Sequence, residues 1–138
     1  MIKKVLVGIF VLQLISTHAV AETNQQVQIF DISQGKVIKY VEVTTDLQQE
    51  VEKFLEGISG VYAKYNPIPN QGFMIRIPLE PNIMVRSQWF DDLVDEVTII
   101  FPKQENPYLM VFDDENNSYF LTFTGDTTKL LSLLNFDL

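Results

Sequence analysis

The 138-residue sequence contains no cysteine and a single histidine, His18. His18 lies in an N-terminal segment that we expect to be removed, so the mature chain would have neither residue type. A chain without Cys and His cannot form disulfides, Cys/His zinc sites, Cys or His haem ligands, cysteine nucleophiles or His-dependent catalytic triads. Catalysis would have to depend on carboxylates, tyrosines or lysines. The composition therefore favours a protein that is not an enzyme, without deciding the question.

Basic residues are also scarce, because 10 Lys and Arg stand against 18 Asp and Glu, a formal net charge of −8. Without Lys3 and Lys4 the mature chain keeps eight basic residues, scattered from Lys36 to Lys129, and its net charge is −10. Nucleic-acid binding requires clustered Lys and Arg. We therefore expect no nucleic-acid partner, whereas an exported or envelope protein, or a glycan, is compatible with this charge.

Only one long hydrophobic run is present, at residues 5–15, directly after Lys3 and Lys4. It is too short for a transmembrane helix, and the small residues Ala19 and Ala21 stand where a signal peptidase reads the chain. We predict a signal peptide over residues 1–21, cleaved before Glu22, and no membrane span in the mature protein. The product would be secreted or periplasmic, in any case extracytoplasmic, and residues 22–138 have the length of a single compact domain.

The order of apolar segments and turn residues predicts an α+β fold. We expect an antiparallel sheet of about five to seven strands, one long amphipathic helix and a short C-terminal helix. The pair Gln34-Gly35 suits a tight hairpin between the first two strands. The expected strands cover residues 27–33, 36–44, 73–79, 83–88, 97–101, 108–113 and 118–124.

Helical periodicity occurs in three places. Thr45 is a candidate N-cap for a helix over residues 46–58, whose apolar residues recur on one face. Residues 87–96 also fit a helical face and are expected to form a short helix or turn. A short apolar helix is predicted over residues 129–134.

The last hairpin offers a candidate interaction surface. Pairing Asp113 with Ser118 across a four-residue loop places Met110 opposite Leu121 on the face that packs on the core. The other face is then more apolar than a solvated sheet face should be. Either the C-terminal helix covers it, or it binds a partner or a second copy of the chain, as a dimer. The residues of this candidate surface are Leu109, Val111, Phe120 and Thr122.

Two acidic clusters are candidate calcium sites, since Ca²⁺ prefers carboxylate oxygens. The first cluster is Asp91, Asp92, Asp95 and Glu96. The second, Asp113, Asp114 and Glu115, lies at the tip of the last hairpin. Paired carboxylates could also act as general acid and base on a glycan. The alternative is structural, because acidic residues favour the first turn of a helix and Asp is common in turns.

The stretch from residue 62 to residue 73 is a candidate recognition loop that carries Tyr62 and Tyr65 among prolines. Together these features favour a small, exported, acidic protein that acts as a non-catalytic binding or interaction module in the cell envelope or extracellular space, with no cofactor. The alternative is a carboxylate-dependent enzyme that acts on glycans, with calcium as a helper.

Overall fold

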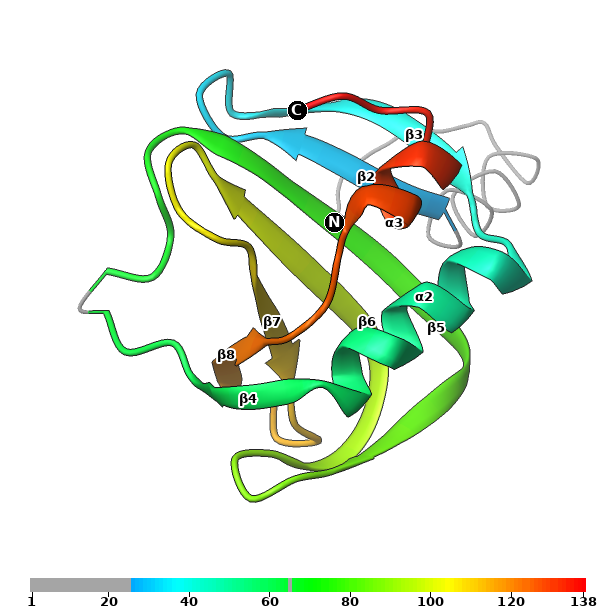
Figure 1. Ribbon diagram of the computed structural model, residues 1–138, viewed down its shortest axis with the longest axis vertical. Helices are drawn as coiled ribbons and strands as arrows, with labels where there is room; N and C mark the ends of the chain where they lie inside the picture. Colours follow the sequence, from blue (N-terminus) through cyan, green and yellow to red (C-terminus); the bar gives the residue numbers. More distant parts are fainter. Residues whose placement is uncertain (1–25, 65) are drawn as a thin grey trace, which may run out of the picture.

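The computed structural model describes residues 26–64 and 66–138, which form a seven-stranded antiparallel sheet with two helices against one of its faces (Figure 1). The strand order is β3-β2-β5-β6-β7-β8-β4. The strands are β2 (Gln26–Asp31), β3 (Lys36–Glu42), β4 (Ile58–Val61), β5 (Gly72–Arg86), β6 (Asp91–Pro102), β7 (Tyr108–Phe112) and β8 (Ser118–Phe123). The predicted antiparallel sheet is confirmed. The α+β description holds only in part, because the sheet dominates and the helices α2 (Thr45–Glu56) and α3 (Thr128–Leu133) are short.

Helix α2 begins one residue earlier than the sequence predicts. Thr44 is its N-cap, and the Thr44 Oγ1 atom accepts a hydrogen bond from the Leu47 backbone N–H at 3.2 Å. The helix ends at Glu56, and Ile58 belongs to β4, an edge strand that the sequence did not predict. The Thr44 side chain at the start of α2 satisfies one of the backbone N–H groups that a helix leaves unpaired there.

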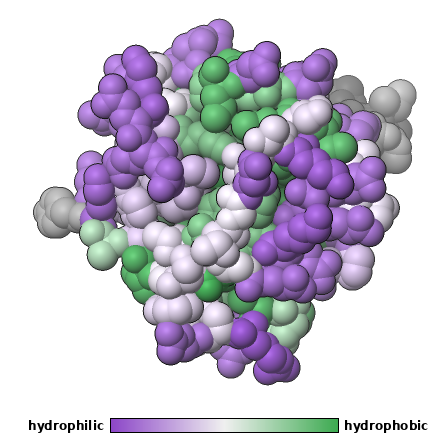
Figure 2. Space-filling model, viewed as in Figure 1, coloured by the Kyte–Doolittle hydropathy of each residue, from purple (hydrophilic) through white to green (hydrophobic). Residues whose placement is uncertain are grey.

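The hydrophobic core lies between the sheet and the two helices. Leu47, Val51 and Phe54 of α2 and Leu130 of α3 are buried against the sheet residues of this face, which is called the inner face below. Glu50 connects the helices, since its Oε2 atom lies 3.0 Å from Lys53 Nζ and 3.6 Å from Lys129 Nζ. Figure 2 shows the molecule from the helix side, with a mostly hydrophilic surface over α2. Helix α2 therefore separates the core from solvent.

The predicted helix or turn over residues 87–96 is wrong, because residues 91–96 belong to strand β6. Strands β5 and β6 form a long hairpin whose register shifts between Pro78 and Ile83. Both Val94 and Val97 are buried on the inner face although they are three residues apart. An irregularity in a strand resets the alternation of side chains, and here it produces a spacing that resembles that of a helix.

The predicted register of the last hairpin is wrong by one residue. Phe112, and not Asp113, pairs with Ser118, so Leu109 lies opposite Leu121 and Met110 opposite Phe120. Asp113 belongs to the turn, where its Oδ1 atom accepts hydrogen bonds from the backbone N–H groups of Glu115 and Asn117, both at 2.9 Å. Because side chains alternate along a strand, this slip moves every β7 residue to the opposite face from the one predicted.

Strand β3 is one edge of the sheet. Its pairing with β2 shifts register between Ile29 and Phe30, and the first hairpin turns through Gly35, whose φ is +67°. The irregular pairing and the lysines Lys36 and Lys39 on β3 are features that protect sheet edges against pairing with other chains. Within residues 26–64 and 66–138, no helix is long and apolar enough to cross a membrane. The predicted signal peptide lies outside the described residues.

Candidate functional site

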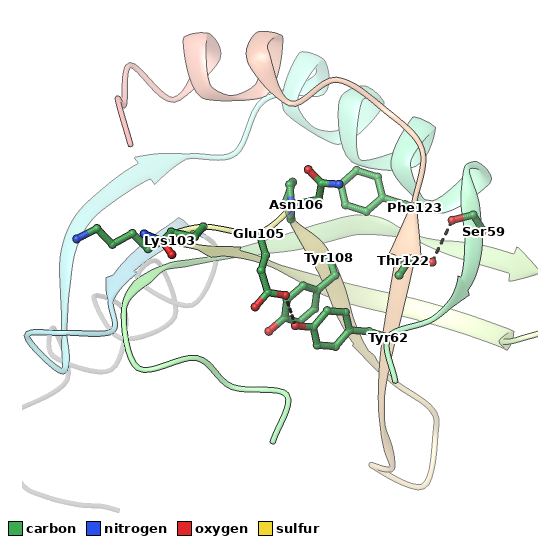
Figure 3. Close-up of a pocket in the computed structure, with 10 residues that line it drawn as sticks. Ser59, Tyr62, Lys103, Glu105, Asn106, Tyr108, Thr122 and Phe123 are labelled. Carbon is green, nitrogen blue, oxygen red and sulfur yellow. Dashed lines mark hydrogen bonds between the residues drawn. The ribbon is translucent and has the colours of Figure 1, made fainter. Parts of the chain in front are cut away.

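A pocket of about 810 Å³ lies where the loop between β6 and β7 meets β4 and the end of β8. Tyr62 follows β4 directly, and its backbone N–H donates to the Phe120 carbonyl at 2.8 Å, which extends the pairing of β4 with β8. Figure 3 shows the Tyr62 and Glu105 side chains directed toward each other and the Lys103 side chain directed away from them. A volume of this size is typical of small-molecule sites.

Two stacked tyrosines form the wall of this pocket. The ring centroids of Tyr62 and Tyr108 are 3.6 Å apart, and the ring planes differ by 11°. Tyr108 is buried and its hydroxyl donates to the Pro67 carbonyl, whereas Tyr62 is half-buried. Since one face of Tyr62 lies against Tyr108, the surface that Tyr62 offers to the pocket is its other face and its edge.

Glu105 fixes the position of Tyr62 from the opposite loop. The Tyr62 hydroxyl donates to Glu105 Oε1 at 2.8 Å, and Lys64 Nζ donates to Glu105 Oε2 at 3.0 Å. Nearby, the Ser59 and Thr122 hydroxyls lie 3.0 Å apart and share a hydrogen bond. We call the group of Tyr62, Lys64, Glu105 and Tyr108 the tyrosine clamp.

The electrostatics of the tyrosine clamp keep each group in its ordinary charge state. The hydrogen bonds from Lys64 and Tyr62 lower the pKa of Glu105, and Glu105 in turn raises the pKa of Lys64. Removal from water, followed by the hydrogen bond to Glu105, raises the pKa of Tyr62. Burial raises the pKa of Tyr108 far above its usual range. At neutral pH the clamp therefore contains a carboxylate, an ammonium group and two neutral phenols.

The structure divides the predicted interaction surface between two faces of the sheet. Leu109 and Val111 are fully buried in the core on the inner face, so they cannot form a surface with the rest. Phe120 and Thr122 are half-buried and lie on the opposite, outer side, next to Tyr62. Leu109 and Val111 therefore do not belong to the predicted surface for a partner or a dimer. Tyr65 lies outside the described residues.

The residues of the first acidic cluster are spread along β6. Glu96 forms an ion pair with Arg76 at 2.7 Å, and Asp91 lies 3.8 Å from Arg86. Asp95 is exposed, beside the register shift between β5 and β6. These three carboxylates have separate surroundings, so they do not form one site.

Asp92 connects the two acidic clusters, since its Oδ2 atom accepts a hydrogen bond from the Asp114 backbone N–H at 3.2 Å. Asp113 accepts hydrogen bonds from Asn117 and Tyr119, which lower its pKa, and Glu115 is exposed. Among the described residues, no group of three or more His, Cys, Asp or Glu side chains could hold a metal ion. The calcium hypothesis gains no support from this geometry.

Sequence reasoning missed Glu105, and it assigned Tyr108 to the core face instead of the pocket. Glu105 lies in a short polar loop between Pro102 and Pro107, and a charged residue in such a loop is a general signal for function. The error for Tyr108 follows directly from the predicted register of the last hairpin. No pattern in the sequence connects Glu105 with Tyr62, because 43 positions separate them.

The chain matches no protein-family model, and comparisons with curated proteins and with solved structures found no significant match.

Proposed function

We propose that this protein is an exported, non-catalytic binding module whose ligand site is the pocket beside the tyrosine clamp. The observation that carries the proposal is the stacked pair of Tyr62 and Tyr108, held from the facing loop by Glu105. An aromatic ring that is already fixed loses little conformational freedom when a ligand packs on it, and such preorganisation favours binding. The predicted signal peptide is the reason for proposing export.

The pKa directions favour binding over catalysis at this pocket. A general acid or base works best with a pKa near the working pH. The pKa of Glu105 is shifted down, and those of Lys64 and Tyr62 are shifted up, so all three move away from neutrality. A carboxylate enzyme that acts on glycans also needs a second carboxyl group with a raised pKa close to the first, and Glu105 is the only acidic residue that lines this pocket in the described part of the chain.

The test is the melting temperature of the purified protein alone and with Ca²⁺, Mg²⁺, cell-envelope glycan fragments and a peptide pool. A ligand that binds only the folded state stabilises it, by about 2.7 kcal/mol at 100 times its Kd. We expect at least one glycan or peptide sample to raise the melting temperature. The variant Tyr62→Ala should show a smaller increase, and Leu93→Ala should keep the full increase, because Leu93 is an exposed apolar residue on β6 outside this pocket.

Three outcomes would contradict the proposal. The first is the absence of a melting shift with every ligand, and the second is a shift that Tyr62→Ala leaves unchanged. The third is turnover of a glycan that disappears in Asp92→Asn while the melting temperature stays the same. That last result would favour the carboxylate-dependent enzyme.

A further inference from the structure

The chemistry of the pocket lining narrows the class of ligand. Of the residues that line it, only Pro107 and Phe123 have purely apolar side chains, and the others carry hydroxyl, amide, carboxylate or ammonium groups. Gln104 and Asn106 present exposed amides, which both donate and accept hydrogen bonds. Such a lining suits a ligand that has many hydroxyl groups and one face able to pack on a ring.

The charge of the site favours a neutral ligand. The Glu105 carboxylate is paired with the Lys64 ammonium group at 3.0 Å, and Lys103, which also lines the pocket, has its side chain directed away from this pair in Figure 3. An anionic ligand would also approach a chain with a net charge of −8. Like-charge repulsion slows and weakens such an association.

An extended peptide fits the site less well. Peptides that add to a sheet edge depend on main-chain hydrogen bonds along several residues and on pockets for apolar side chains. Strand β4 is only four residues long, and its pairing with β8 shifts register between Ile58 and Gly60. The neighbouring pocket is polar, so it offers little apolar area to an anchoring side chain.

We propose that the ligand of this pocket is a neutral glycan, with one sugar ring packed on the free face of Tyr62 and its hydroxyl groups bonded to the polar loop of residues 103–106. The inference rests on the proposed function, since it assigns a ligand class to the same site. Glu105 and Lys64 act as positioning residues, because Glu105 accepts the hydrogen bond of the Tyr62 hydroxyl and Lys64 holds the Glu105 carboxylate.

Isothermal titration calorimetry with cellotetraose, chitotetraose, a tetramer of galacturonic acid and the peptide pool tests the ligand class. We expect a neutral tetrasaccharide to bind and the acidic tetramer to bind at least about tenfold more weakly. Tyr62→Ala should weaken glycan binding about tenfold. Tyr62→Phe, which keeps the ring and loses the hydroxyl group, should weaken it less, and Leu93→Ala should leave it unchanged.

The pH profile of binding tests the positioning role of Glu105. In the wild type the affinity should stay level above pH 4.5, the ordinary pKa of a glutamate, and fall as the pH drops through the lowered pKa of Glu105. Glu105→Gln should bind more weakly at neutral pH and lose this acidic decrease. A wild-type affinity that stays level in acid, or an acidic decrease that Glu105→Gln retains, would contradict this positioning role.

The outcomes separate the ligand class from the proposed function. Binding of a peptide that Tyr62→Ala removes, together with no binding of either neutral glycan, would overturn the glycan inference and leave the binding module in place. Binding of the acidic tetramer in preference to the neutral ones would also overturn it. Absence of binding by any of these probes would overturn both proposals.

Discussion

The inner and outer faces of strands β7 and β8 are built from alternate residues of the same two segments, yet they have different surroundings. On the inner face Leu109 and Leu121 lie opposite each other and are fully buried under the helices. On the outer face Met110 and Phe120 lie opposite each other, are half-buried, and have no helix over them in the described part of the chain. Both faces are apolar in sequence, so hydrophobicity alone does not distinguish a core from a surface.

The difference comes from what each face contacts. Helices α2 and α3 exclude water from the inner face, and close packing against them makes each inner side chain important for stability. On the outer face Phe120 lies beside Tyr108, which stacks on Tyr62, and these two tyrosines line the pocket together with the polar loop before β7. The inner face therefore stabilises the fold, and the outer face next to β4 leads to the pocket that we propose as the ligand site.

The largest expected effect on stability is that of truncating a residue of the inner face. Truncation of its neighbour on the outer face is the comparison. Leu109→Ala removes a fully buried side chain and should lower the free energy of unfolding by about 2–5 kcal/mol. Met110→Ala, one residue along the same strand, should lower it by no more than about 1 kcal/mol, because Met110 is half-buried. Urea unfolding of both variants measures the difference. Equal losses would show that the two faces are equally packed.

The cap of the covering helix should have a smaller effect. Thr44→Ala removes the hydrogen bond to the Leu47 N–H and should lower the free energy of unfolding by about 1 kcal/mol. Thr45→Ala is the control, since the sequence alone favoured Thr45 as the cap. Chemical unfolding of the two variants decides between them, and a larger loss for Thr45→Ala would restore the sequence-based assignment.

The ion pair on the outer face should contribute less. The Arg76 and Glu96 side chains remain 33% and 28% exposed at a distance of 2.7 Å, and Arg76→Gln should lower the free energy of unfolding by at most about 1 kcal/mol. High salt screens exposed charges. The difference from the wild type should therefore shrink in 1 M NaCl, and an undiminished difference would mean that this pair is shielded from solvent.

The smallest expected effect on stability belongs to Glu105 of the tyrosine clamp, whose side chain is exposed to solvent. Because the folded state lowers the pKa of Glu105, its stabilisation is complete above pH 4.5 and disappears as the pH falls through the lowered pKa. The melting temperature of Glu105→Gln should lie slightly below that of the wild type at neutral pH and converge with it in acid. A difference that grows in acid would contradict the assigned direction.

Several elements could be predicted because their signals are local. The first hairpin follows from Gln34-Gly35 between two apolar segments, and helix α2 follows from the spacing of Leu47, Val51 and Phe54. The short C-terminal helix also follows from a local apolar run. In each case neighbouring residues in the chain carry the pattern, so no knowledge of distant contacts is required.

The errors occur where the register of two paired strands differs from a regular alternation. Asp113 uses its side chain to close the turn before β8, and this moves the pairing of β7 by one residue. The register shift between Pro78 and Ile83 similarly places Val94 and Val97 on one face and imitates a helix. A one-residue change reverses every assignment of faces beyond it. The predicted surface therefore included two core residues, Leu109 and Val111.

The sequence by itself determined the antiparallel sheet, the positions of both helices and the excess of acidic residues, because composition and short-range periodicity specify them. Only the tertiary structure decided which face of the sheet is core. It also decided that Tyr62, Glu105 and Tyr108 lie next to one another. Glu105 and Tyr62 meet because the pairing of β8 with both β4 and β7 places the end of β4 level with the start of β7. Strand order and register arise from packing the whole chain, and a local pattern contains no information about either.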